Sequence, residues 1–270
     1  MSLPESYEVF AVRYATMRNR WRHDNFIGVD PHDDPPMPID FYVWVIRNAN
    51  RTIVVDTGFD RADAEARGRE ITRLPREGLA MVGVDAAAVE NVIVTHLHWD
   101  HAGTLDHFPK ARFHIQDREM AVATGRCMCY PTLRAPYTAD HVCTLVRRVF
   151  EGRVAFHDGD DEIAPGITVH HLGGHAAGLQ SVRVMTERGW VVLASDASHF
   201  YENMERGLPF PIVYDMAAML QGHDRLRRLA SSPRHVVPGH DPLVLRRYPA
   251  PETGLEGVVA RLDVEPRDEG

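Results

Sequence analysis

Apolar residues gather in short runs along the chain, and most of these runs end at Gly, Asp or Asn. Short runs rich in Val, Ile and aromatic residues, bounded by turn-forming residues, are typical of β-strands. They predict strands at seven places: 41–47, 51–56, 91–95, 111–115, 167–172, 190–195 and 235–238.

The segments between these runs are richer in Ala, Leu, Met, Glu and Arg, with apolar residues at helical spacing. This pattern predicts helices at 61–72, 85–90, 116–125, 139–150 and 215–231. Helices that alternate with strands or flank them indicate an α/β or α+β fold with layered sheets. Segment 126–142 mixes aromatic residues, prolines and cysteines without a period, so we expect an inserted loop near a pocket.

Composition restricts the class further. A chain of 270 residues with 44% hydrophobic residues can bury one substantial core, and we expect one domain over residues 1–270. The first residues lack the apolar region of a signal peptide, and no run approaches 18 apolar residues, which predicts a cytoplasmic protein without a membrane segment. The odd number of cysteines (Cys127, Cys129 and Cys143) fits a reducing compartment. A net charge of −8 with scattered arginines argues against a nucleic-acid partner.

The strongest chemical pattern is His96-Leu97-His98-Trp99-Asp100-His101, directly after the apolar run 92–95. Residues two apart on an extended chain point the same way, so His96 and His98 can bind one ion. The following turn can bring Asp100 and His101 toward a second ion. Burying this many imidazoles without a metal would leave costly unsatisfied polar groups, whereas the isolated histidines elsewhere are better explained by packing.

Three further residues, His175, Asp196 and His240, each follow the end of a predicted strand. Strand ends of one sheet lie along one edge, so seven donors on one rim predict a dinuclear site. Imidazole and carboxylate donors without a thiolate favour two Zn²⁺ ions per chain, with Mn, Fe or Co as alternatives. Two such ions would share a carboxylate and a water, whose pKa would fall toward roughly 7 to give a hydroxide nucleophile.

With this motif, and with Asp56-Thr57-Gly58 after a strand, the chain resembles the metallo-β-lactamase superfamily. The resemblance implies an αββα sandwich with the site at the sheet edges. The spacings of 21 residues from His175 to Asp196 and 44 from Asp196 to His240 resemble most the N-acyl homoserine lactonase group. Catabolic lactonases such as 4-pyridoxolactonase look equally similar.

The same resemblance implies a division of the donors. His96, His98 and His175 would hold one zinc and Asp100, His101 and His240 the other, with Asp196 as the bridge. Asp56 would orient the site loops, although a plain turn carboxylate explains it equally well.

One position departs from the lactonases, which commonly carry a substrate-facing Tyr three residues beyond the bridging Asp. Here His199 stands there, followed by Phe200 and Tyr201, and we expect all three to contact substrate. His199 would donate a hydrogen bond or a proton, and Asp100 or Asp196 would relay a proton. Aromatic residues are the other predicted pocket walls, with core packing as the alternative: Trp21, Phe26, Tyr130, Phe200, Tyr201, Phe210 and Tyr214.

These features predict an enzyme that opens a lactone, its small-molecule partner, by attack of a metal-bound hydroxide. Two alternatives stay open: hydrolysis of another acyl compound, such as a thioester or β-lactam, and a metal-binding sensor module without turnover. The apolar run 208–213 suggests a homodimer, or else it lines the pocket.

Overall fold

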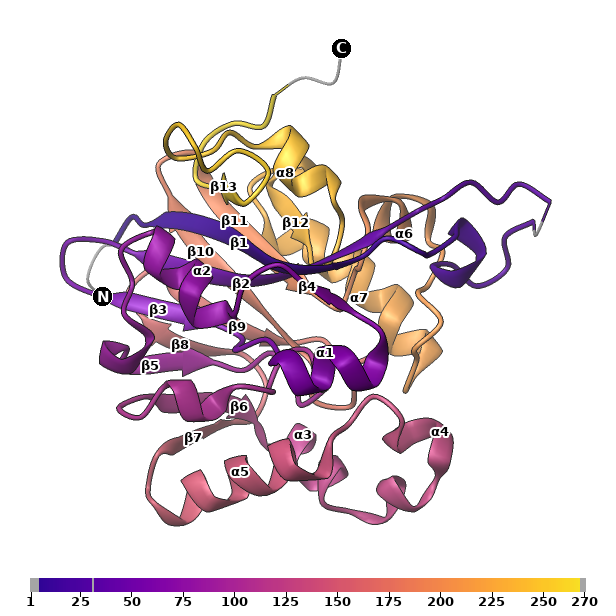
Figure 1. The fold of residues 1–270 in the computed structure, drawn as a ribbon, viewed down its shortest axis with the longest axis horizontal. Coiled ribbons are helices and arrows are strands. Elements are labelled where there is room, and N and C mark those ends of the chain that lie inside the picture. The colour runs from indigo at the N-terminus through magenta and orange to yellow at the C-terminus, as the bar shows by residue number, and fades with distance from the viewer. Residues whose placement is uncertain (1–4, 31, 268–270) are drawn as a thin grey trace.

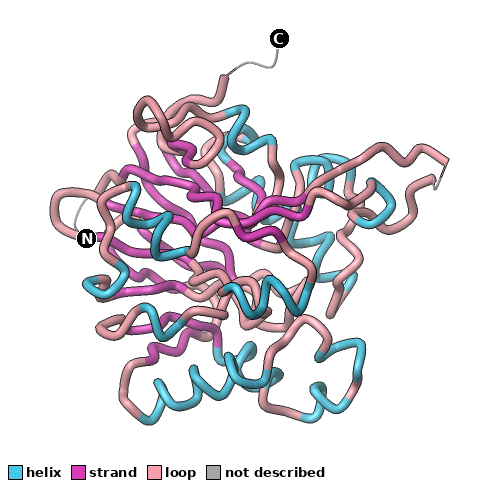
Figure 2. Tube along the Cα trace, in the orientation of Figure 1, coloured by secondary structure: helices cyan, strands magenta, loops and turns pink. Residues whose placement is uncertain are grey.

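In the computed structural model, which describes residues 5–30 and 32–267, two β-sheets stack face to face and helices cover their outer sides (Figure 1). Strands occupy the centre of the molecule, and helices and loops its periphery (Figure 2). The predicted αββα sandwich is therefore confirmed. Within the described ranges, no helix combines the length and the apolar character needed to cross a bilayer.

The first sheet is mixed and has the strand order β13-β1-β2-β3-β5-β6-β7, with β4 also paired to β1. Antiparallel pairs join β1, β2 and β3, and parallel pairs join β3, β5, β6 and β7. Its strands are β1 (Glu8–Met17), β2 (Ile39–Arg47), β3 (Thr52–Val55), β4 (Glu70–Ile71), β5 (Asn91–Ile93), β6 (Arg112–Gln116), β7 (Val154–His157) and β13 (Val259–Arg261).

The second sheet has the order β12-β11-β10-β9-β8 and is antiparallel except for the parallel pair of β11 and β12. Its strands are β8 (Asp161–Ala164), β9 (Ile167–His171), β10 (Gln180–Thr186), β11 (Gly189–Ser195) and β12 (Val236–Pro238).

Helix α2 packs against β1 of the first sheet, and helix α7 packs against β11 of the second. The helices are α1 (Arg61–Arg67), α2 (Pro75–Met81), α3 (Asp117–Ala123), α4 (Pro131–Arg134), α5 (Ala139–Phe150), α6 (Tyr201–Arg206), α7 (Met216–Leu229) and α8 (Leu243–Arg247). Short 3-10 turns lie at η1 (Arg22–Asp24), η2 (Ala86–Ala88), η3 (Leu105–His107), η4 (Arg126–Cys129) and η5 (Pro233–His235). The segment between β1 and β2 extends away from the body as an arm (Figure 1).

Alternation along the strands divides the core in two. In β1, Phe10 and Val12 pack into the cluster on the helical side, while Val9 and Ala11 pack into the cluster that includes the strands of the second sheet. Successive side chains of a strand point to opposite faces, so a strand covered on both faces must be apolar throughout. This explains why β1 has no clear apolar and polar alternation in its sequence.

All seven predicted strands are strands in the structure, with shifts of one or two residues at their ends. Two helix predictions are wrong in part. Segment 61–72 is helical only to Arg67, because Asp60 caps the start of α1 and Gly68, with a φ of 64°, ends it; the chain then joins β1 as β4. Segment 85–90 forms only the 3-10 turn η2. Asp85 caps its start, and the backbone is already extended at Val89, so the helix cannot continue.

Candidate metal centre

The loops that leave β5, β9, β11 and β12 bring the seven predicted donors to one edge of the sandwich. Six of the seven side chains are buried, and Asp100 is the most exposed, at 12%. The backbone is strained next to one of them: Ser195, the last residue of β11, has a φ of 48°, which L-residues rarely adopt. Such strain is found where the surrounding structure fixes a functional side chain, and here it directs Asp196.

Three of the histidines are anchored through one ring nitrogen. The Nδ1 of His101 lies 2.7 Å from the carboxylate of Asp56. The Nδ1–H of His175 donates to the carbonyl of Ile212 at 2.9 Å, and that of His240 donates to the carbonyl of Asp40 at 2.8 Å. Metal-binding histidines usually use one nitrogen in this way, because it fixes the ring and leaves Nε2 for the ion.

The remaining ring nitrogens converge on Asp196. Its Oδ2 lies 3.1 Å from the Nε2 of His175 and 3.8 Å from that of His96. Its Oδ1 lies 3.0 Å from the Nε2 of His240 and 3.2 Å from that of His101. One carboxylate therefore faces two groups of histidines at once.

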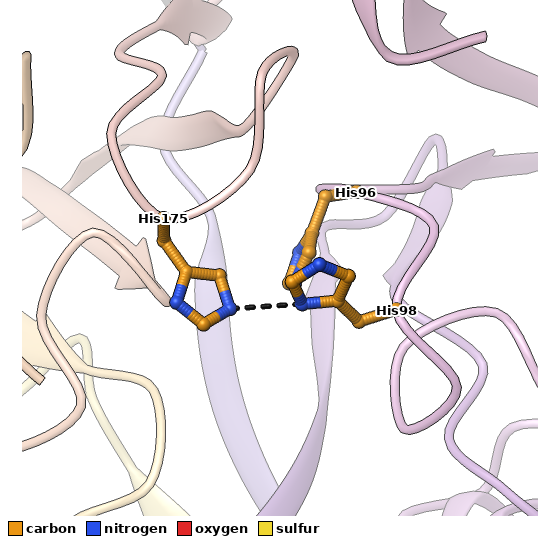
Figure 3. Close-up of side chains that lie close together, drawn as sticks. All are labelled: His96, His98 and His175. Atoms are coloured by element: carbon orange, nitrogen blue, oxygen red, sulfur yellow. Dashed lines mark hydrogen bonds between the residues drawn. The ribbon is translucent and has the colours of Figure 1, made fainter. Parts of the chain in front are cut away.

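The first of these groups is shown in Figure 3, where His96, His98 and His175 turn their rings toward one another. The Nδ1 of His98 lies only 2.9 Å from the Nε2 of His175. The second group is Asp100, His101 and His240. In each group the donor atoms lie within 4.8 Å of one another, close enough to bind one ion.

The residues fit two divalent metal ions. In the part of the chain that the structure describes, the Nε2 atoms of His96 and His101 are buried without a hydrogen-bond partner, which is costly unless something binds them. Burial, together with the positive charge of neighbouring histidines, lowers the pKa of His96 and His98 well below the usual value. Neutral imidazoles with available lone pairs are what a metal ion requires.

Asp56 connects this centre to the first sheet. It directly follows β3 with a φ of 61°, and its carboxylate accepts hydrogen bonds from the backbone and hydroxyl of Thr95. Burial raises the pKa of Asp56, although His101 opposes this shift. The geometry agrees with an orienting role, since Asp56 holds the ring of His101 with its Nε2 toward Asp196.

Sequence reasoning missed Glu119, a fully buried carboxylate in α3. It accepts hydrogen bonds from the backbone of Leu97 and Gly178 and from the hydroxyl of Tyr137. Leu97 lies between two donors of the first group, and the ring of Tyr137 packs 4.7 Å from that of His98. Glu119 thus ties two donor loops together, but its main partners are backbone groups that no sequence pattern marks.

His199 lies inside the centre. Its Nε2 is 3.0 Å from Asp196, and its ring stacks on Phe210 at 3.5 Å. Burial lowers the pKa of His199 to about 3, which favours the predicted hydrogen bond from a neutral ring over proton transfer from a ring that titrates near neutrality. His175, Asp196 and His199 also form a further possible donor group.

Two of the expected substrate contacts lie elsewhere. Phe200 is fully buried and packs against Phe26, and Tyr201 packs under the guanidinium of Arg247 on another side of α6. Neither lines the cavities at the metal centre, because the chain turns into α6 directly after His199. At this turn the side chains of His199, Phe200 and Tyr201 point in different directions, so His199 alone reaches the metal centre and the predicted substrate contacts of Phe200 and Tyr201 are wrong.

Two adjoining cavities open above the donors. An inner cavity of about 110 Å³ is lined by Trp99, Phe210 and five of the seven donors, all except His96 and His101. An outer cavity of about 290 Å³ extends to Tyr214 and segment 126–142. Of the predicted aromatic walls, Phe210 and Tyr214 are therefore in place. Trp21 and Tyr130 are exposed outside these cavities. Segment 126–142 contains η4 and α4 and forms one wall, rather than an irregular loop.

A sandwich of this kind with a buried centre of histidines and aspartates defines a metal-dependent hydrolase. The family comparison agrees: residues 42–240 match the model of the metallo-beta-lactamase superfamily. The chain belongs to this superfamily.

Relatives within the superfamily share a narrower activity. An N-acyl homoserine lactonase of Bacillus cereus is 27% identical over 216 residues, which cover 74% of this chain and 80% of that protein. N-acyl homoserine lactonase AiiB of Agrobacterium fabrum is 26% identical over 185 residues, covering 59% of this chain and 63% of that protein. The crystal structure of a quorum-quenching N-acyl homoserine lactone lactonase superposes with a TM-score of 0.72 at 22% identity, covering 89% of this chain and 94% of that one.

Proposed function

We propose that this hydrolase opens the ester ring of a lactone to give a hydroxy acid. The observation that carries the proposal is the position of Asp196, whose two oxygens face two separate groups of donors. The names of the relatives support the choice of a cyclic ester. AidC, a dizinc quorum-quenching lactonase, shares the fold with a TM-score of 0.67 at 15% identity, covering 90% of each chain.

His96, His98 and His175 would hold one ion, and Asp100, His101 and His240 the other, with Asp196 between them. Nitrogen and oxygen donors without a thiolate favour zinc, with Mn, Fe or Co as alternatives. Two such ions would supply an ionised water as nucleophile and would polarise the ester carbonyl.

The protein's own groups would orient the substrate and move protons. Asp100 is the most exposed donor and lines the inner cavity, so it or Asp196 is placed to take a proton from the attacking water and return it to the leaving alkoxide. His199, neutral because burial holds its pKa at about 3, would donate a hydrogen bond to the carbonyl oxygen. The apolar walls of the inner cavity, which include Phe41, Trp99 and Phe210, would reduce the contact of bulk water with the bound ester and so strengthen these interactions.

The test is turnover by zinc-loaded protein of a panel that contains N-acyl homoserine lactones, simple lactones, thioesters and nitrocefin. We expect lactones to be hydrolysed with the highest kcat/KM. A preference for thioesters or for nitrocefin would replace this proposal by the corresponding acyl hydrolase. Metal binding without turnover of any compound would favour a sensor module.

A further inference from the structure

Positive charge lines the cavities above the metal centre. Arg20 and Arg69 both line the inner cavity, together with Trp99 and Phe210. Arg69 also lines the outer cavity, so it stands where the two cavities adjoin. A neutral acyl chain requires no cations at this point, and the arginines therefore need their own explanation.

Arg69 is half-buried with much of its hydrogen-bonding capacity unused. It lies just beyond α1, its guanidinium is 5.6 Å from the ring of Trp99, and its Nη1 donates to the carbonyl of Arg67 at 2.5 Å. Its Nε is buried without a hydrogen-bond partner, and no carboxylate among residues 5–30 and 32–267 forms an ion pair with it. Asp100 lies close enough to act on its charge but is a donor of the metal centre.

Arg20 reaches the same space from the arm between β1 and β2. Its guanidinium lies 5.1 Å from the ring of Phe210 and donates to the side chain of Asn25 and to the carbonyl of Asp24. Within the described ranges it too has no ion pair. Burial lowers the pKa of Arg20, the nearby carboxylate of Asp24 opposes this shift, and the positive charge of Arg69 adds to it. Both cations line the same inner cavity.

Arg67 shows what a purely structural arginine looks like here. It also packs on Trp99, at 4.7 Å, but its two terminal nitrogens donate to the carbonyl of Ala135 and to the hydroxyl of Thr138. It lines only the outer cavity. Arg69 and Arg20 differ from it because they border the cavity that holds the metal donors.

We propose that Arg20 and Arg69 form an anion subsite, and that the substrate is a lactone that carries a carboxylate. Half-buried cations without an ion pair are costly, and a substrate carboxylate would supply both arginines with a counter-charge. The planar guanidinium matches a carboxylate in two parallel hydrogen bonds. Both arginines line the inner cavity of about 110 Å³ together with five of the donors, so the carboxylate would lie beside the ring that is opened. The identity of the substrate as a lactone rests on the proposed function, whereas the binding of a carboxylate by the two arginines does not.

The test compares 5-oxotetrahydrofuran-2-carboxylate with the corresponding carboxamide, which has the same ring and nearly the same size but no charge. The wild-type protein should favour the carboxylate by about 10- to 100-fold in kcat/KM, the range expected for charge-assisted hydrogen bonds. Arg69→Met and Arg20→Met should each remove most of this preference, because kcat/KM for the carboxylate should fall far more than kcat/KM for the carboxamide. Arg67→Met, the matched control, should keep it, and Arg69→Lys should keep part of it because the charge remains.

Binding of inert ligands separates this inference from the reaction. Calorimetry of the zinc-loaded protein with cyclopentanecarboxylate and cyclopentanecarboxamide should show tighter binding of the carboxylate, and Arg69→Met should abolish the difference. If neither lactone is hydrolysed but the carboxylate binds more tightly and Arg69→Met abolishes this difference, the lactonase proposal fails and the subsite stands. A difference that persists in Arg69→Met would mean that the carboxylate binds the zinc ions, and the subsite is refuted. If both lactones are hydrolysed equally and the arginine variants change neither rate nor binding, the carboxylate is not recognised and the subsite is refuted. Equal zinc content and circular dichroism would show that the variants are folded.

Discussion

Two buried histidine clusters lie on this sandwich, and they differ in how their nitrogens are used. At the metal centre, three rings are anchored through Nδ1 while their Nε2 atoms converge on Asp196. Beside β6 and β7, His114 and His157 stack with centroids 5.3 Å apart. There every ring nitrogen has a partner, because the two rings contact each other and their outer nitrogens face Asn91 and Asp161.

The hydrogen-bond partners of its two ring nitrogens distinguish a ligand histidine from a structural one. Both kinds are buried, so burial alone decides nothing. In a structural cluster every ring nitrogen has a hydrogen-bond partner within the protein, so no ion or ligand is needed to satisfy it. In a ligand cluster one side of each ring is satisfied and the other side points at a common position. We therefore expect perturbation of the first cluster to affect metal and turnover, and perturbation of the second to affect only stability.

The largest effect is expected from Asp196→Ala. Without its carboxylate, the two donor groups would lose the negative charge between two close cations. We predict that the zinc content falls below two per chain and that kcat decreases by about 10³-fold or more. Elemental analysis and steady-state rates measure both quantities.

Asp161→Ala is the matched control, since this carboxylate contacts a histidine of the other cluster. It should retain two zinc ions and full activity. A wild-type protein that is fully active with a single ion would contradict the dinuclear centre.

A smaller effect is expected from His199→Ala, which removes a ring that lines the inner cavity. If His199 contacts substrate, kcat should fall by about 10²-fold while two zinc ions remain bound. Because burial holds the pKa of His199 at about 3, its titration should not contribute to the kcat profile between pH 5 and 8. His199→Tyr should recover part of the rate, since a phenol can also donate a hydrogen bond. Loss of one ion in the alanine variant would instead identify His199 as a ligand.

Glu119→Gln should weaken metal binding without removing any donor. The amide cannot accept hydrogen bonds as strongly from Leu97, Gly178 and Tyr137 together, so the loops that carry His98 and His175 would be less well held. Partners of this kind typically contribute about 10- to 100-fold to metal affinity. Competition with a chelator measures the affinity. Tyr137→Phe, which removes one of the three hydrogen bonds, should have a smaller effect, and equal affinities for all three proteins would assign Glu119 to packing alone.

The sequence predicted the donor loops well for a definite reason. Each donor follows a strand with an apolar pattern, and the ends of β9, β11 and β12 share an edge of the second sheet. The donors after β5 come from the first sheet and join the others only because the two sheets pack face to face. It did not predict β1 or β10 as strands, because Arg13 and Arg183 interrupt their short apolar runs. It also placed Tyr201 in the pocket, since nothing in the residues marks the turn into α6. Glu119 could not be found because its main hydrogen-bond partners are backbone groups, which come close only in the folded chain. Arg69 could not be found because the lack of a partner for its Nε is likewise visible only in the folded chain.

The smallest effect on activity, and the sharpest contrast with the metal centre, is expected from His114→Gln. Burial and the neighbouring His157 lower the pKa of His114 from 6.5 to about 4, so the folded protein binds fewer protons than the unfolded chain between these values. The stability that the neutral ring contributes is therefore fully present above pH 6.5 and is lost as the pH falls, by about 2 kcal/mol at pH 5. The glutamine variant cannot titrate.

Its urea unfolding curve should shift less than that of the wild type between pH 7.5 and pH 5, while zinc content and kcat at pH 7.5 stay unchanged. Buried histidines that do not contact His114 lose stability equally in both proteins, so the difference between the two curves reports the titration of His114 together with its partner His157. Parallel pH dependences would mean that His114 is protonated as easily in the folded protein as in the unfolded chain. The hydrogen bonds that His114 and His157 form with each other, Asn91 and Asp161 would then not prevent protonation of His114. The proposed difference between this cluster and the histidines of the metal centre would be wrong.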